Sequence, residues 1–184
     1  MPPASSHRVR IIGGRHRGRI VHFPAAAGLR PTPDRVRETL FNWLGQDLTG
    51  QRTLDLYAGS AALSLEALSR GAALAVAVDR NPVLVRAAVA TAAAFGASGL
   101  EAHADDGAAF LARERRRFDV IFLDPPFGTD PWLTLLPAAA ARLDAGGFIY
   151  AEAANSITPP PGLVVHRGDR AGQVHYHLLV AAPA

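Results

Sequence analysis

Residues 53–60 read Thr53-Leu-Asp-Leu-Tyr-Ala-Gly-Ser60, an apolar run that passes directly into a turn containing glycine. Such a run followed by Ala-Gly-Ser is typical of a β-strand that enters the turn before a helix. The next residues, 61–70, are largely apolar and are followed by Gly71, a residue that commonly ends helices. This stretch therefore predicts a strand–turn–helix unit, the building block of a parallel sheet.

The same unit recurs along the chain after residue 71. Short apolar runs bounded by turn residues predict the strands, and longer apolar segments predict the helices. The expected strands are 74–78, the residues just before Asp105, 118–123 and 147–152, and the expected helices are about 82–95, 107–116 and 132–142. We therefore predict an α/β fold, a Rossmann-like parallel sheet with helices on both faces.

The last segment of the chain departs from this alternation. Residues 163–166 and 173–180 both have the apolar and β-branched character of strands, with no helical segment between them. We expect these two strands to form a hairpin that closes the sheet.

The composition limits the class of protein. The chain has 184 residues, of which 49% are hydrophobic and 19% charged, values that exclude disorder and suit one domain. Its lack of cysteine excludes a disulfide scaffold, a thiol nucleophile and a thiolate metal site. No apolar run reaches the roughly 18 residues of a membrane span, and the first residues lack a secretory apolar region. We therefore expect a cytoplasmic protein that does not bind a membrane.

Positive charge is concentrated near the start of the chain, and every basic residue is arginine. Residues 7–37 hold eight arginines and one acid, a net charge of +7, whereas residues 38–184 hold 11 arginines and 15 acids, a net charge of −4. A basic arm on a mildly acidic body indicates that a polyanion docks at one end. We accordingly divide the chain into a basic arm with a helix, residues 1–48, and a main domain, residues 49–184.

The arm predicts a small β-hairpin followed by a helix. Residues 9–14 and 18–23 are short β-like runs joined by a turn rich in glycine and arginine. Thr32 has a side chain suited to capping a helix, and Pro33 suits the first helical position. The apolar residues that follow recur at helical spacing and form one stripe, consisting of Val36, Leu40, Trp43 and Leu44.

Acidic residues stand at or near the ends of four consecutive predicted strands. These residues are Asp55, Asp79, the pair Asp105 and Asp106, and Asp124. The carboxyl ends of parallel strands meet at one edge of the sheet, where ligands bind in folds of this kind. The four acidic positions are therefore expected to gather around one binding site.

The first turn and the second strand have the spacing of a nucleoside site. Gly59 permits close approach of the backbone to a ligand, and Asp79 follows it by 20 residues, the usual position of an acid that binds ribose hydroxyls. The turn is not G-x-G-x-x-G, and a chain without lysine has no Walker motif. The sequence therefore favours a nucleoside ligand without a pyrophosphate.

Residues 124–127 read Asp-Pro-Pro-Phe and carry the most specific signal. Two prolines end the preceding strand abruptly and leave carboxylate and carbonyl acceptors at the edge of the sheet. Such acceptors suit a substrate that presents an amino group, and Phe127 offers a flat face on which a planar base can stack. An extruded nucleobase with an exocyclic amine meets both requirements.

These motifs resemble those of a known family. The chain looks like a class I S-adenosylmethionine-dependent methyltransferase, and it is similar to the RsmD family, which methylates the N2 amine of guanine in small-subunit (16S) ribosomal RNA. The stretches that carry the resemblance are 10–19, 28–44, 54–60, 65–71, 124–127 and 172–176. Asp-Pro-Pro-Phe alone identifies only amino methyltransferases, whereas Leu29-Arg-Pro-Thr32 is specific to the RsmD family.

The resemblance assigns roles to the residues singled out above. It implies S-adenosylmethionine as the cofactor, with ribose bound by Asp79 and the adenine amine bound by Asp106 rather than Asp105. The expected cofactor-binding residues are Asp55, Tyr57, Gly59, Ser60, Asp79, Arg80, Asp105 and Asp106. The expected catalytic residues, which would hold the target guanine, are Asp124, Pro125, Pro126 and Phe127.

The resemblance also gives the basic arm a partner, ribosomal RNA within an assembled or assembling small ribosomal subunit. Arginine side chains bind phosphates and contribute affinity with little sequence readout. The residues expected at RNA are Arg10, Arg15, Arg17, Arg19, Arg30, Arg35 and Arg37. We expect a monomer, and we expect no metal site because His175 and His177 have no evident third ligand nearby.

One position departs from the family pattern. Ala61 stands where the family usually has glycine. The additional methyl group is expected either to crowd the methionine end of the cofactor or to need a backbone angle that alanine disfavours. Both effects bear on the affinity for the cofactor rather than on its identity.

Three other functions remain open at this point. An adenine-N6 methyltransferase acting on DNA or RNA shares the Pro-Pro-aromatic motif, and a base-specific assay separates it from a guanine enzyme. A nicotinamide oxidoreductase is disfavoured by the lack of G-x-G-x-x-G. The third alternative is a non-catalytic RNA-binding ribosome assembly factor. Ala61 favours it slightly, whereas the intact acids and the Asp-Pro-Pro-Phe motif argue against it.

Overall fold

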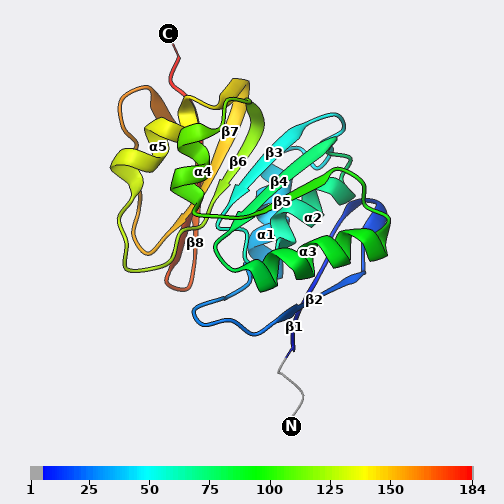
Figure 1. The fold of residues 1–184 in the computed structure, drawn as a ribbon. Coiled ribbons are helices and arrows are strands. Elements are labelled where there is room, and N and C mark those ends of the chain that lie inside the picture. The colour runs from blue at the N-terminus through cyan, green and yellow to red at the C-terminus, as the bar shows by residue number, and fades with distance from the viewer. Residues whose placement is uncertain (1–5, 184) are drawn as a thin grey trace.

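The computed structural model describes residues 6–183 and consists of a seven-stranded sheet with helices and a separate two-stranded hairpin (Figure 1). The sheet has the strand order β5-β4-β3-β6-β7-β9-β8. Its strands are β3 (Arg52–Leu56), β4 (Leu74–Asp79), β5 (Leu100–Ala104), β6 (Phe118–Leu123), β7 (Leu143–Ala153), β8 (Leu163–Ala171) and β9 (Val174–Ala181). Strands β3 to β7 are parallel, whereas β9 lies antiparallel between β7 and β8. The predicted α/β sheet is confirmed, with the C-terminal hairpin at one edge.

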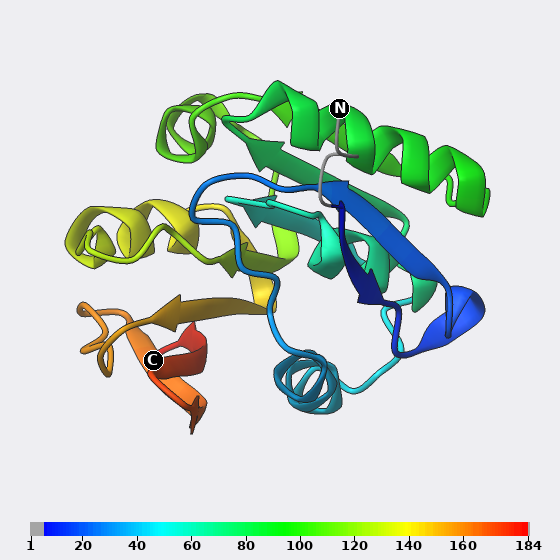
Figure 2. The same ribbon diagram turned by 90° about the horizontal axis from the view of Figure 1, so that it is seen from below.

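Helices cover both faces of this sheet, as the sequence predicts. One face carries α1, α2 and α3, and the opposite face carries α4 and α5 (Figures 1 and 2). The helices are α1 (Asp34–Trp43), α2 (Ala62–Ser69), α3 (Pro82–Phe95), α4 (Gly107–Arg113) and α5 (Trp132–Ala140).

Local sequence sets most of the helix ends. Helix α3 begins after Asn81, whose side chain accepts the N–H of Val83, and it ends at Gly96, which has a φ of 64°. Helix α4 is shorter than expected and ends at Arg113, because Glu114 already has an extended backbone. Among residues 6–183, no helix combines the length and the apolar character needed to cross a bilayer.

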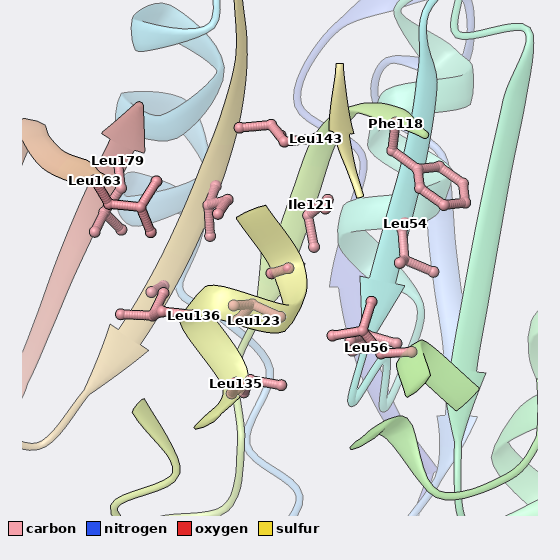
Figure 3. Packing of buried hydrophobic residues seen from close by; sticks show 14 of the residues in the cluster. Leu54, Leu56, Phe118, Ile121, Leu123, Leu135, Leu136, Leu143, Leu163 and Leu179 are labelled. Carbon is pink, nitrogen blue, oxygen red and sulfur yellow. The ribbon is translucent and has the colours of Figure 1, made fainter. Parts of the chain in front are cut away.

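Residues of the central strands alternate between the two faces of the sheet. Leu54 of β3 and Ile121 of β6 pack on the α4 and α5 side, where they join Leu135 in one core (Figure 3). Val120 and Phe122 of β6 pack on the opposite side, beneath α1 and α2. The strands are buried on both faces, which explains why they appear in the sequence as continuous apolar runs.

The N-terminal extension is a hairpin followed by α1. Strand β1 (Ser6–Arg10) pairs antiparallel with β2 (Ile20–Pro24), and a short 3-10 turn (Gly14–His16) lies between them. Val9 and Phe23 of the hairpin are buried in a core shared with α2 and α3. The predicted hairpin and helix extension is confirmed, whereas a domain boundary at residue 48 stays a prediction.

Candidate active site

A cavity of about 550 Å³, here called the main cavity, opens at the carboxyl end of the parallel strands. Its volume lies within the roughly 300–1,000 Å³ typical of small-molecule sites. The segment between β2 and α1 crosses this end of the sheet and forms one wall (Figure 2). The predicted site residues that line the main cavity are Arg30, Tyr57, Gly59, Asp79, Arg80, Asp105, Asp124, Pro125, Pro126 and Phe127. The structure thus brings most of the predicted site together.

The turn after β3 is shaped by left-handed backbone at Tyr57, with a φ of 70°, and at Gly59, with a φ of 55°. A Cβ atom at Gly59 would lie 2.6 Å from Cδ1 of Leu29, so a larger residue here would displace the Leu29 side chain. Asp79 holds the turn in place, because its Oδ2 accepts the N–H of Gly59 at 2.8 Å and its Oδ1 accepts the N–H of Asn81 at 2.8 Å. The spacing of Gly59 and Asp79 in the sequence therefore reflects a direct contact.

Ala61 has a φ of 57°, the left-handed conformation that alanine disfavours. This geometry confirms the backbone cost expected from the sequence, about 1–2 kcal/mol for a residue other than glycine. The methyl group is buried in a small apolar cluster with Ala77 and Ala88, and Ala61 is not among the residues that line the main cavity. Crowding of the cofactor by this methyl group stays a prediction.

Asp55 and Ser60 lie beneath the main cavity instead of in its wall. Asp55 is 3% exposed, and its Oδ2 accepts the hydroxyl of Ser64 at 2.8 Å. Burial raises the pKa of Asp55 to about 7, and the nearby charge of Asp79 acts in the same direction. The structure therefore buries these two side chains outside the lining of the main cavity, and their contact with the cofactor stays a prediction.

The adenine contact expected of Asp106 rather than Asp105 stays a prediction. Asp105 lines the main cavity, whereas Asp106 caps α4, with its Oδ1 accepting the N–H of Ala109 at 2.8 Å. The Nε of Arg80 also donates to Oδ2 of Asp106 at 2.8 Å. The bonds from Ala109 and Arg80 hold the pKa of Asp106 below its usual range. Asp105 is engaged as well, because its Oδ1 accepts the N–H of Asp106 at 2.7 Å and its Oδ2 pairs with Arg113, so hydrogen bonding does not distinguish the two acids.

Asp124 follows directly after β6, where Pro125 and Pro126 end the strand. Burial raises the pKa of the Asp124 carboxyl well above its usual range, and the charges of Glu152 and Asp55 raise it further. Phe127, in contrast, is 54% exposed although it is a large apolar residue. The motif therefore places a half-buried acceptor next to an exposed aromatic face.

Glu152 is a site residue that the sequence analysis missed. It lies near the end of β7, the neighbour of β6 in the sheet, and is 5% exposed. Its Oε1 accepts the hydroxyl of Tyr150 at 2.8 Å and that of Thr32 at 3.0 Å, and burial raises the pKa of Glu152. Thr32 was expected to cap α1, but its hydroxyl binds Glu152, and α1 begins without a side-chain cap. The signal in the sequence was the acid that ends the predicted strand 147–152.

Arg37 was expected at RNA, and the structure corrects this expectation. The side chain is completely buried, so no phosphate can reach it. Its guanidinium donates to Asp34 at 2.5 Å, to Glu66 at 3.2 Å and to the carbonyl oxygen of Arg10 at 2.8 Å. Burial lowers the pKa of Arg37, while the charges of Glu66 and Asp34 oppose this effect. Arg37 is therefore a structural residue of the arm.

Glu66 of α2 is the centre of a buried network that we call the arm anchor, formed by Arg37, Glu66 and Arg70. Glu66 accepts the backbone N–H of Ile12 at 2.9 Å and that of Gly13 at 2.7 Å. On its other side it accepts the Arg70 guanidinium at 2.9 Å. One carboxylate thus joins the hairpin, α1 and α2.

The other arginines expected at RNA are exposed: Arg10, Arg15, Arg17, Arg19, Arg30 and Arg35. The guanidinium of Arg19 donates to the carbonyl oxygens of Ala94 and Phe95 and lies 4.0 Å above the Phe95 ring, so it secures the end of α3. Arg15 and Arg17 form no ion pair within residues 6–183 and are the more accessible cations of the turn.

His175 and His177 lie on β9 with their rings stacked 6.4 Å apart. In the part of the chain that the structure describes, no group of three or more histidine, cysteine, aspartate or glutamate side chains could hold a metal ion.

A sheet of this topology with a binding cavity at its carboxyl edge is the architecture of class I S-adenosylmethionine-dependent methyltransferases, and this protein is a methyltransferase of that class. The family model described as Conserved hypothetical protein 95 matches residues 9–180. Ribosomal RNA small subunit methyltransferase D of Escherichia coli strain K12 is 37% identical over 184 aligned residues, covering 95% of this chain and 91% of the relative. The chain belongs to this family, the RsmD family.

Solved structures agree with this assignment. The structure of yhhF from Escherichia coli matches with a TM-score of 0.84 and 36% identity, covering 94% of this chain and 97% of that chain. The Thermus thermophilus 16S rRNA N2 G1207 methyltransferase, solved with AdoMet and guanosine, matches with a TM-score of 0.72 and 23% identity. That match covers 97% of this chain and 50% of the other, and it shows a shared fold.

Proposed function

We propose that the protein transfers a methyl group from S-adenosylmethionine to the N2 amine of a guanine in 16S ribosomal RNA. The observation that carries the proposal is the segment after β6, where the half-buried Asp124 and the exposed Phe127 ring border the main cavity. Membership of a family whose Escherichia coli member is named ribosomal RNA small subunit methyltransferase D supports the RNA substrate.

The main cavity has the character that S-adenosylmethionine requires. It combines close backbone approach at Gly59 with the carboxylates of Asp79 and Asp105, acceptors that suit hydroxyls and amines. When bound, the cofactor supplies a methyl group on a positively charged sulfur. We assign the ribose to Asp79, and we assign an adenine contact to Asp105, the acid that borders the main cavity.

The protein's main task is then to align the guanine amine. The lone pair of this amine is delocalised into the ring, so the amine is a poor nucleophile until its hydrogens are held by acceptors. Asp124 and the carbonyl oxygen of Pro125 are the acceptors assigned to that task, and Phe127 supports the flat face of the base. An ionised Asp124 would also stabilise the positive charge that develops on nitrogen.

We further propose that the exposed arginines of the arm position RNA phosphates. Arg15 and Arg17 on the turn and Arg30 at the wall of the main cavity extend from the hairpin to the site. The finer expectations, a monomer that acts in the cytoplasm on an assembled or assembling small subunit, belong to this proposal.

The test is transfer of labelled methyl from S-adenosylmethionine to small ribosomal subunits that lack the modification, followed by nucleoside analysis. Naked 16S RNA serves as the parallel substrate, and light scattering of the free protein reports its oligomeric state. We expect labelled N2-methylguanosine, with more label on subunits than on naked RNA. Labelled N6-methyladenosine would overturn the guanine assignment, and cofactor binding without any label would overturn the ribosomal substrate.

A further inference from the structure

A second, smaller cavity of about 150 Å³, here called the side cavity, lies between the segment after β6 and the segment after β7. Pro125, Pro126 and Phe127 line both this cavity and the main cavity, so the two cavities meet at the Asp-Pro-Pro-Phe segment. Trp132 adds a second aromatic side chain to the side cavity. A base held at this segment therefore lies where groups that line either cavity can contact it.

Glu152 lines the side cavity and is held there in a fixed orientation. The hydroxyls of Thr32 and Tyr150 both donate to Oε1, from the segment before α1 and from β7 itself. No side chain or backbone group of residues 6–183 donates to Oε2, and Oε2 is not among the buried side-chain atoms that lack a partner. One carboxylate oxygen is therefore occupied by the protein, and the other is left for a ligand.

The position of this carboxylate relative to Asp124 matters because guanine presents two neighbouring donors on one edge. Leu123 of β6 is in register with Ala151 of β7, so Asp124 and Glu152 are the next residues at the ends of neighbouring strands. Guanine carries the N1–H beside its N2 amine, whereas adenine has an unprotonated acceptor at N1. Two acceptors side by side match the guanine edge, whereas adenine N1 has no hydrogen to donate to Oε2.

We propose that Glu152 is a specificity-determining residue whose Oε2 accepts the N1–H of the target guanine while Asp124 accepts from the N2 amine. The inference rests on the proposed function, because it names the contact that selects guanine in that reaction. Thr32 and Tyr150 are positioning residues, since they act on the base only through Glu152. The Leu29-Arg-Pro-Thr32 segment thereby gains a part in base selection.

The test replaces the mapped target guanine by 2-aminopurine in 16S RNA that is assembled into small subunits. 2-Aminopurine keeps the amine that receives the methyl group but has no hydrogen on N1. We expect the wild-type protein to prefer guanine by about 10-fold to 100-fold in kcat/KM, the effect of one hydrogen bond to a charged group. A Glu152→Gln variant keeps the shape and the bonds to Oε1, and its amide can donate to the unprotonated N1. The preference for guanine should therefore fall to less than about threefold.

Glu38→Gln is the matched control, because Glu38 is an exposed glutamate on α1 and should leave the preference unchanged. A wild-type preference near one, or a Glu152→Gln preference equal to that of the wild type, would overturn the inference. If Glu152→Gln shows no cooperative thermal transition and so does not fold, the preference of the wild-type protein for guanine over 2-aminopurine is the test of the inference. Failure of the wild-type protein to methylate guanine in any subunit would instead overturn the proposed function.

Discussion

Two groups of buried charged side chains hold this molecule together, and they are built on opposite principles. In the arm anchor, Glu66 lies between Arg37 and Arg70, and its two oxygens accept hydrogen bonds from both guanidinium groups and from backbone N–H groups. Near the carboxyl end of the sheet, Asp55, Asp124 and Glu152 are three acidic groups of one sign, and hydroxyl groups donate to the first and the last of them. When Asp34, which also pairs with Arg37, is counted with the arm anchor, that group has two positive and two negative side chains, whereas the second group consists of acids alone.

This difference indicates that the arm anchor stabilises the fold, whereas the group of acids serves the reaction. A balanced buried pair is costly to break because the remaining partner is left without compensation, so the arm anchor fixes the hairpin on α2. Like charges that share a buried site raise one another's pKa, and such groups are concentrated where proteins bind or transform a substrate. Substitutions should therefore affect stability in one group and activity in the other.

The largest effect is expected from Asp124→Ala. The substitution removes the acceptor for the guanine amine, so methyl transfer should fall by about a thousandfold. Removal of a buried carboxyl from a like-charged group should leave the free energy of unfolding equal or higher. Methyl-transfer rates, cofactor binding by calorimetry and urea unfolding check this, and loss of cofactor binding together with activity would indicate a folding defect instead.

Glu66→Gln tests the balanced group. The variant leaves Arg70 without its counter-charge and leaves Arg37 with Asp34 alone, so the free energy of unfolding should fall by about 3 kcal/mol. The control Glu38→Gln changes an exposed glutamate and should stay within about 0.5 kcal/mol of the wild type. Urea unfolding measures both, and equal stability of the two variants would show that the arm anchor is dispensable.

The unbalanced group should make stability depend on pH. Asp55 has a pKa of about 7 in the fold against an ordinary 3.8, so between pH 4 and pH 7 it is protonated when folded and ionised when unfolded. Its contribution is complete below the ordinary pKa and is lost as pH rises through the folded pKa, by about 1.4 kcal/mol per pH unit. Urea unfolding of Asp55→Asn at pH 5 and pH 7 should lack this loss. An unchanged slope in the variant would assign the dependence to another group.

Removal of exposed arginines from the arm is expected to have a smaller effect than the substitutions of buried acids. Arg15→Gln with Arg17→Gln removes two exposed cations, so the slope of log binding constant against log salt should fall by about 1.4 to 1.8. Stability should change by less than about 0.5 kcal/mol, because neither side chain forms an ion pair within residues 6–183. Filter binding of small-subunit RNA over a salt series measures the slope. An unchanged slope would place the RNA elsewhere.

The smallest effect is expected from Ala61→Gly. Glycine relieves the left-handed backbone, but it also loses a buried methyl group and gains freedom when unfolded, so the terms nearly cancel. Because Ala61 does not line the main cavity, affinity for S-adenosylmethionine should change by less than about threefold in calorimetry. A tenfold gain in affinity would instead support crowding of the cofactor.

The fold could be predicted because its signals are local. The apolar runs of β3, β4 and β6 are buried, and Asn81 and Gly96 mark the two ends of α3 in the sequence. The order of the sheet is not local, since β9 enters between β7 and β8 through pairings that no short pattern encodes. The end of α4 was missed for a similar reason, because Arg116, which pairs with Glu114, also pairs with Glu101 of β5.

The site could be predicted where function depends on chain position and not where it depends on tertiary partners. Asp79 ends β4 and Asp124 follows β6, and both lie at the same edge of the sheet, so their positions could be predicted from the sequence. Glu152 acquires its orientation from Thr32, 120 residues away, and Arg37 is buried by Glu66, 29 residues away. A basic residue near other basic residues gives no sign that a distant carboxylate will enclose it.

The arm anchor also affects the order in which parts of the chain can fold during synthesis. Ile12 and Gly13 leave the ribosome 54 and 53 residues before Glu66, the side chain that holds their backbone. At about 5–20 residues per second, the hairpin waits roughly 3 to 11 s for its partner. During that interval its arginines are displayed on an unattached nascent segment. The part of the molecule made first is thus among the later parts to be secured.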